Sequence, residues 1–162
     1  MIIVVMGICS SGKTLIGQML AKRLGLDFYD ADDFHPQSNI KKMKSQMPLN
    51  DDDRLPWLRT MAEQMPKWQE SGGAVLACSA LKQSYRNILM TGGDIRFVFL
   101  KGTKEIILKR MKSRKNHFMP TSLVESQLKT LEEPRGAVTV EITGTTEEIV
   151  SEIMMKLDEP EK

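Results

Sequence analysis

Apolar residues in this chain occur in short runs that alternate with segments in which they recur every three or four positions. Continuous apolar runs over 2–6, 74–78 and 97–100 predict strands covered on both faces, and shorter patterns over 27–30 and 138–142 predict two more. The intervening periodic segments predict helices over 13–24, 37–46, 51–65, 81–90, 103–115, 122–131 and 145–157. Strands alternating with helices predict an α/β fold, with a parallel sheet that has helices on both faces.

Three local signals bound the predicted helices. Gly25 stands where a left-handed C-terminal cap is expected, and Thr145 with Glu148 forms a capping-box signature. Pro66 removes one backbone donor and clashes with the preceding turn. We therefore expect the helix that contains Pro66 to kink or end before Trp68.

Composition narrows the class of partner. The chain has 162 residues, of which 23 are basic and 21 acidic, with a formal net charge of +2. One domain is expected, without the charge excess of a nucleic-acid or membrane surface, so the partner should be a small molecule. Two cysteines make no disulfide framework, and the first residues carry neither a charged leader nor a long apolar stretch. These features predict a cytoplasmic protein.

Directly after the first predicted strand the chain reads GICSSGKT, which fits the phosphate-loop pattern GxxxxGK[ST]. The glycines let backbone N–H groups turn into one anion-sized hollow, and the lysine and the helix N-terminus reach the same phosphates. The final hydroxyl suits Mg²⁺. The predicted nucleotide-binding residues are Gly7, Ile8, Cys9, Ser10, Ser11, Gly12, Lys13 and Thr14.

An acidic cluster follows the second predicted strand. Asp30, Asp32 and Asp33 supply carboxylates there, whereas the acid that often follows another strand in such proteins is missing after 74–78. Because the carboxyl ends of parallel strands meet at one edge, one carboxylate is placed to serve a metal and another to accept a hydrogen bond from a hydroxyl. A surface acidic turn is the alternative. No NKxD-like segment is present, which disfavours a guanine-specific switch protein.

Longer strings carry a family resemblance. They are YDADDFHP (29–36), NIKKMKSQMPLNDDDRLPWL (39–58), ACSALKQSYRNIL (77–89), HFMP (117–120) and SLVESQLKTLEEP (122–134). With these strings in this order, nearly the whole chain resembles the gluconate kinases. The resemblance implies transfer of the ATP γ-phosphoryl group to the 6-hydroxyl of D-gluconate. It also implies one three-layer P-loop kinase domain over 1–162, like the nucleoside monophosphate and shikimate kinases, with a helical substrate-binding insertion near 36–70, a lid near 110–135 and a homodimer.

Roles can be assigned on this basis. Phosphoryl transfer needs alignment and charge neutralisation, so Lys13 and the loop amides would hold the β and γ phosphates. Thr14 would bind Mg²⁺ together with Asp30 or Asp32. We expect Asp32 to orient the attacking hydroxyl and to accept its proton late, with Asp30 as the metal ligand beside Thr14.

A pocket for gluconate should offer cations and hydrogen-bonding groups to a carboxylate and a row of hydroxyls. The resemblance points to His35, Arg54, Lys82, Arg86 and His117. Lys82 and Arg86 lie four apart in a predicted helix, which indicates one shared face, with a solvated face as the alternative. A zinc site is not expected, because the histidines and cysteines match no zinc spacing.

Arg110 and Arg114 are also four residues apart, on a basic predicted helix that precedes HFMP. In related kinases, arginines of this region close over the transferring phosphate and exclude water. We therefore expect both to be catalytic. A basic surface that serves solubility is the alternative.

The phosphate loop departs from the family's usual GxSGSGKS at Cys9 and Ser10. Ser10 stands at a position expected to need a backbone angle that is costly for a residue with a side chain. Cys9 lies near a helix N-terminus, so a lowered thiol pKa and a redox-sensitive loop are conceivable.

Two other functions are compatible with the loop. The chain would phosphorylate another small polyol or hydroxy acid such as shikimate, or it would be a non-catalytic ATP-binding regulatory protein. The presence of Lys13, Thr14, Asp32 and the lid arginines argues against the second. A panel of acids distinguishes the first.

Overall fold

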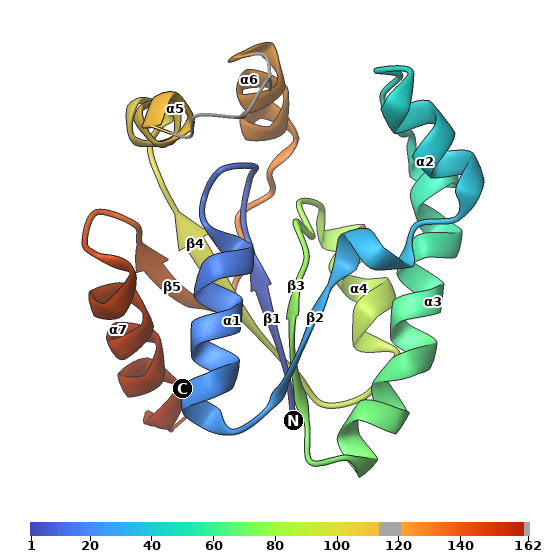
Figure 1. Ribbon diagram of the computed structural model, residues 1–162. Coiled ribbons are helices and arrows are strands. Elements are labelled where there is room, and N and C mark those ends of the chain that lie inside the picture. Colours follow the sequence, from blue (N-terminus) through green and yellow to red (C-terminus); the bar gives the residue numbers. More distant parts are fainter. Residues whose placement is uncertain (114–120, 161–162) are drawn as a thin grey trace.

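A five-stranded parallel sheet forms the centre of the molecule (Figure 1). The computed structural model describes residues 1–113 and 121–160. In this part of the chain the strand order is β2-β3-β1-β4-β5, with bounds Ile2–Met6 (β1), Asp27–Asp30 (β2), Ala74–Ala77 (β3), Ile95–Lys101 (β4) and Val138–Glu141 (β5). The predicted parallel α/β sheet is confirmed.

Helices cover both faces of this sheet. Their bounds are Lys13–Leu24 (α1), Gln37–Lys44 (α2), Asp51–Glu70 (α3), Gln83–Met90 (α4), Lys104–Ser113 (α5), Thr121–Thr130 (α6) and Thr146–Asp158 (α7), with a short 3₁₀ helix η1 at Ala31–Phe34. Helices α1 and α7 pack on one face and α3 and α4 on the other, which confirms the three layers. Helices α5 and α6 lie beyond the carboxyl ends of the strands, and α2 stands on the opposite side of the same edge (Figure 1). No helix within 1–113 or 121–160 combines the length and apolarity needed to cross a bilayer.

The central strand β1 joins the two layers of the core. All of its side chains are 0% exposed. Ile3 and Val5 belong to the cluster under α1 and α7, whereas Val4 and Met6 belong to the cluster under α3 and α4. Successive strand side chains point to opposite faces, so a continuous apolar run is what a strand covered on both sides requires. Burying one such side chain contributes roughly 1.5–3 kcal/mol.

Two predicted caps are present in the structure. Gly25 has φ 68° and closes α1, with backbone bonds to carbonyls of the last turn. The Thr145 hydroxyl accepts the N–H of Glu148 at 3.2 Å and begins α7. Both caps satisfy backbone groups that the helix itself leaves unpaired.

Helix α3 passes through Pro66 and continues to Glu70, so of the two expected outcomes, a kink or an end before Trp68, the end is contradicted. Trp68 is 6% exposed and stacks on Tyr29 with ring centroids 4.2 Å apart, and Met65 is 0% exposed. This packing offsets the roughly 3 kcal/mol that an interior proline costs a helix. Pro66 has no N–H to donate to the Ala62 carbonyl, which lies four residues earlier in the helix. Gly92 packs beside this carbonyl, and a Cβ at Gly92 would lie 2.8 Å from its oxygen, so only glycine fits there.

Candidate active site

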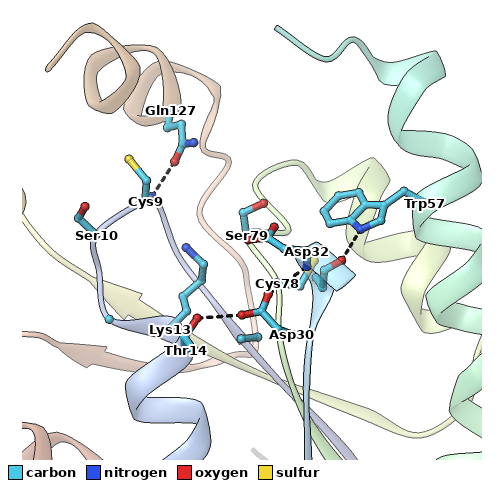
Figure 2. A pocket seen from close by; sticks show the side chains of 13 residues that line it. Cys9, Ser10, Lys13, Thr14, Asp30, Asp32, Trp57, Cys78, Ser79 and Gln127 are labelled. Carbon is cyan, nitrogen blue, oxygen red and sulfur yellow. Dashed lines mark hydrogen bonds between the residues drawn. The ribbon is translucent and has the colours of Figure 1, made fainter. Parts of the chain in front are cut away.

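A cavity of about 250 Å³ opens at the carboxyl edge of the sheet (Figure 2). The phosphate loop lines one side, and the ends of β2 and β3 line another. Trp57 from α3 and Gln127 from α6 complete the wall. The structure thus brings Asp30 and Asp32 together with five of the predicted nucleotide-binding residues; Gly7, Ile8 and Ser11 belong to the same loop but do not line the cavity.

The phosphate loop takes the backbone angles that its sequence pattern requires. Gly12 has φ 93°, and Ser10 has φ 62°, in the left-handed region that disfavours residues with a side chain. The expectation that the Ser10 position needs a costly angle is therefore confirmed. The Ser10 side chain is buried, and its hydroxyl has no hydrogen-bond partner in the described part of the chain.

Lys13 points back into its own loop. Its Nζ donates to the Ile8 carbonyl oxygen at 2.9 Å, and the Ser11 hydroxyl donates to the same oxygen at 2.7 Å. Burial lowers the pKa of Lys13, while the charges of Asp32 and Asp30 oppose that shift. The ammonium has three donors, and residues 1–113 and 121–160 give it one acceptor, so an anion in the cavity would satisfy it.

Asp30 and Asp32 hold different positions at the end of β2. Asp30 accepts the Thr14 hydroxyl at 3.0 Å and caps η1 by accepting the Asp32 N–H at 3.0 Å. The carboxylate of Asp32 also lines the cavity (Figure 2). Burial and then the charge of Asp30 raise the pKa of Asp32.

The Thr14 and Asp30 pair suits Mg²⁺. A hydroxyl and a carboxylate are hard oxygen ligands, and Mg²⁺ usually binds one or two protein carboxylates together with waters and phosphates. The described residues contain no group of three or more His, Cys, Asp or Glu side chains able to hold a metal. A metal at Thr14 and Asp30 would thus rely on a phosphate and waters for its other ligands.

His35 lies against the wall of the cavity. Its ring stacks on Trp57 with centroids 4.3 Å apart, and Trp57 donates its indole N–H to the Ala31 carbonyl at 2.7 Å. The His35 Nδ1 lies 3.2 Å from the Asn39 amide nitrogen. Burial and the charge of Arg54 lower the pKa of His35, so the ring is neutral at neutral pH.

A polar network lies around Arg54 and Lys82. Arg54 donates to the Tyr85 hydroxyl at 3.3 Å and to the Leu49 carbonyl at 2.7 Å. Lys82 and the Tyr85 hydroxyl donate to Asp51 at 3.0 and 2.5 Å. Lys82 and Tyr85 therefore bind one carboxylate, the kind of group that the predicted substrate carries, and Arg54 adds a donor to the Tyr85 hydroxyl.

Arg86 does not share a face with Lys82, and this prediction is wrong. Lys82 has φ −101° and ψ 147° and precedes α4 as its N-cap, so the four-residue spacing does not run along a helix. The Arg86 guanidinium is buried and donates to the carbonyls of Ala80 at 2.7 Å and Glu132 at 2.7 Å. It lies away from the cavity that the phosphate loop lines.

Two residues of the segment predicted as a lid, 110–135, lie at the phosphate loop. Arg110 on α5 donates to the Ile142 carbonyl at 2.8 Å, and its Nη1 lies 3.4 Å from where a Cβ on Gly12 would stand. Gln127 on α6 accepts the Cys9 N–H at 2.6 Å. The predicted residues Arg114 and His117 lie outside the described residues.

Comparisons with known proteins place the chain in a family. The shikimate kinase family model matches residues 9–158. A probable gluconokinase of Xenopus tropicalis is 44% identical over 178 residues, covering 98% of this chain and 94% of that protein. The thermosensitive gluconokinase of Escherichia coli K12 is 45% identical over 137 residues, covering 82% of this chain and 72% of that protein. The chain belongs to the gluconokinase family.

Solved structures agree with the gluconokinase assignment. A gluconokinase from Sinorhizobium meliloti 1021 superposes with a TM-score of 0.87 at 43% identity, covering 96% of this chain and 90% of that one. A shikimate kinase from Aquifex aeolicus has a TM-score of 0.57 at 19% identity, covering 98% of this chain and 96% of that one, and shows the shared fold. The P-loop kinase fold expected from the sequence is confirmed.

In this member of the gluconokinase family, the cysteine of the loop behaves differently from the sequence-based expectation. Burial raises the pKa of the Cys9 thiol, and the charge of Lys13 only partly opposes the shift. Burial also raises the pKa of Cys78, which lines the same cavity, to about 12. The expected lowering of the Cys9 pKa is therefore contradicted.

Four residues of the site were not predicted from the gluconokinase pattern: Trp57, Asp51, Tyr85 and Gln127. Asp51 begins a helix, where acids are common, so its place in the sequence gave no sign of a role in the site. Tyr85 follows Lys82 by three positions, which was a usable signal. Gln127 is 118 residues from its partner Cys9 and carries no charge, so no spacing rule indicated their contact.

Proposed function

We propose that this chain transfers the γ-phosphoryl group of ATP to the 6-hydroxyl of D-gluconate, giving ADP and 6-phospho-D-gluconate. The observation that carries the proposal is one cavity lined by Lys13 and the phosphate loop on one side and by Asp32 on another. Arg54 and Lys82 lie outside this lining, in the network that Asp51 and Tyr85 complete. The relatives named gluconokinase support the choice of acid.

Lys13 and the loop amides hold the β and γ phosphates of ATP in this proposal, except the Cys9 N–H, which Gln127 accepts. The half-buried ammonium and the helix N-terminus favour anions at that place. Thr14 and Asp30 hold Mg²⁺, which when bound neutralises phosphate charge. We assign the metal to Asp30 because its carboxylate already contacts the Thr14 hydroxyl.

Asp32 orients the 6-hydroxyl and accepts its proton. As the bond between the hydroxyl oxygen and the γ-phosphorus forms, the bond from that phosphorus to the β,γ-bridging oxygen breaks and ADP leaves. The proton passes to the Asp32 carboxylate. A raised pKa makes Asp32 a stronger base than an ordinary aspartate, which suits a late proton transfer.

The remainder of gluconate binds between α3 and α4. Its carboxylate takes the place that Asp51 now occupies on Lys82, and Arg54 and His35 contribute donors nearby. Arg86 supports this pocket from behind by holding the β3–α4 connection to Glu132, rather than by touching the acid. Residues 36–70 thereby form the substrate-binding insertion, and His117 keeps the role that the family resemblance implies.

The segment 110–135 acts as a lid in this proposal. Arg110 lies beside the phosphate loop and is positioned to neutralise charge on the transferring group, with Arg114 in the same role by resemblance. Closure excludes water, which would otherwise compete as the acceptor. We also propose a homodimer on the resemblance alone, and a cytoplasmic location on the composition.

A coupled assay of ADP release with ATP, Mg²⁺ and a panel of acids tests the function. We expect turnover with D-gluconate, little with shikimate or other aldonates, and a loss of at least about 10²-fold in Lys13→Ala. Preference for another acid would transfer the assignment to that acid. Tight ATP binding without turnover on any acid would support the regulatory alternative and overturn the proposal.

A further inference from the structure

Gln127 makes a direct contact between the lid and the phosphate loop. Its Oε1 accepts the backbone N–H of Cys9 at 2.6 Å, across 118 residues of sequence. Both residues line the cavity that contains Lys13, and Figure 2 shows Gln127 directly above the loop. None of the roles assigned above uses this contact.

The peptide group between Ile8 and Cys9 is held at both of its polar atoms. Its carbonyl oxygen accepts Lys13 Nζ at 2.9 Å and the Ser11 hydroxyl at 2.7 Å, and its N–H donates to Gln127. Gln127 therefore binds the same peptide as the lysine that reaches the β and γ phosphates. A shift of α6 relative to the loop would move this peptide or break its bond.

Helix α6 is anchored so that Gln127 reaches the loop from a defined place. Val124 is 0% exposed in the core cluster, and Glu125 pairs with Lys104 of α5 at 2.5 Å. Just beyond the helix, the N–H of Glu132 donates to the Leu81 carbonyl at 2.8 Å. The helix is thus tied to α5 and to the β3–α4 connection that carries Lys82.

The amide nitrogen of Gln127 is available to bind a ligand. Its oxygen is occupied by Cys9, whereas its Nε2 makes no hydrogen bond within residues 1–113 and 121–160. An uncharged amide can donate two hydrogen bonds to phosphoryl oxygens without placing another charge in the cavity. A carboxylate in the same place would keep the acceptor for Cys9 and repel the phosphate.

We propose that Gln127 is a catalytic residue that fixes the Cys9 N–H through its oxygen and donates its amide N–H to the transferring γ-phosphoryl group. The lid then distinguishes ATP from ADP, because ADP lacks the group that Gln127 binds. The inference rests on the proposed nucleotide site at Lys13. It does not depend on which acid accepts the phosphoryl group.

Binding of ADP and of a non-hydrolysable ATP analogue to Gln127→Glu and Gln127→Met tests this proposal. We expect the analogue to bind about 10- to 100-fold more weakly to Gln127→Glu, with ADP affinity changed by less than about threefold. Gln127→Met should lose affinity for the analogue selectively too, and kcat should fall in both variants. Ser126→Ala, an exposed change on the same helix, is the matched control and should behave as wild type.

The two nucleotide affinities and kcat together separate a catalytic role of Gln127 from a structural one. Equal weakening of ADP and the analogue, or wild-type kcat in Gln127→Met, would overturn the proposal and leave Gln127 as a loop support. If Gln127→Met fails to fold, the same ratio in Gln127→Glu decides, since that change keeps the acceptor for Cys9. Failure of the wild type to phosphorylate gluconate would refute the proposed substrate, yet the ratio of nucleotide affinities would still test Gln127.

Discussion

The phosphate loop and the network around Arg54 and Lys82 are built in opposite ways. In the loop, Lys13 and Ser11 bond to an Ile8 carbonyl only five and three residues away. In the network, Tyr85 bonds to Asp51 and Arg54 across 34 and 31 residues. A contiguous motif can be read from its own residues, whereas a pocket assembled from two helices exists only after they pack.

The charges of the two regions differ as well. Lys13 is half-buried and Asp32 is exposed at the cavity, and partial loss of hydration shifts the pKa of each against its charged form, so both await a ligand. Asp51 is exposed and pairs with the half-buried Lys82, and hydrogen bonds from Tyr85 and Lys82 lower the pKa of Asp51. At the loop, the phosphates of a nucleotide would bind Lys13 without displacing a carboxylate. In the network, the acid must displace Asp51 from Lys82.

The largest expected effect comes from replacing, one at a time, the two aspartates that line the cavity beside the phosphate loop, Asp32 and Asp30. Asp32→Asn should lower kcat by about 10²- to 10⁴-fold, because the hydroxyl loses its base. Asp30→Asn should chiefly raise the Mg²⁺ concentration needed for half-maximal rate. Steady-state kinetics at several Mg²⁺ concentrations measure both, and near-normal turnover in Asp32→Asn with loss in Asp30→Asn would exchange the roles.

Changes in the acid-binding network should affect gluconate and spare ATP. Arg54→Met and Lys82→Met should each raise KM for gluconate about 10- to 100-fold, since each removes a charge-assisted hydrogen bond. KM for ATP should stay within about threefold. Arg59→Met, an exposed change on α3, is the control. A parallel rise in KM for ATP would show that the two regions do not act separately.

A smaller effect is expected from relieving the strained loop residue. Ser10→Gly should raise the free energy of unfolding by about 1 kcal/mol, because Ser10 adopts φ 62° and buries an unpaired hydroxyl in the described structure. The melting temperature should rise by about 2–4 °C. Ser11→Gly should instead destabilise, since Ser11 bonds to Ile8. Calorimetry decides, and a lower melting temperature for Ser10→Gly would contradict the strain.

The least disruptive test compares two aspartates by NMR titration of the free enzyme. Asp32 should titrate above the ordinary aspartate pKa of 3.8, and Asp51 below it. In Tyr85→Phe the pKa of Asp51 should move back toward 3.8, because the largest cause of its shift is removed. Coincident titration of Asp32 and Asp51 would contradict the difference between the regions.

The pKa shifts of Asp51 and Asp32 affect the pH dependence of stability in opposite directions. Asp51 stabilises the fold above the unfolded pKa, and this contribution is lost as pH falls through the lower folded pKa. Asp32 binds its proton more tightly in the folded state, so its contribution falls as pH rises from the unfolded value through the raised one. Asp32→Asn should therefore remove a destabilising term at neutral pH.

Much of the fold followed from short-range patterns. Residues 2–6 predicted a buried strand, and residues 7–14 predicted the loop with a costly angle at Ser10. Gly25 and Thr145 marked helix ends correctly. These features depend on backbone sterics and hydrogen bonds between near neighbours, so the sequence by itself determined them.

Tertiary packing decided the rest. Stacking of Trp68 on Tyr29 accompanies the passage of α3 through Pro66, and four carbonyl and amide acceptors hold Arg86 away from the cavity. The contact of Gln127 with Cys9 likewise joins distant segments. Such contacts compete with local preferences at a few kcal/mol each, and their outcome depends on which surfaces meet once the sheet is formed.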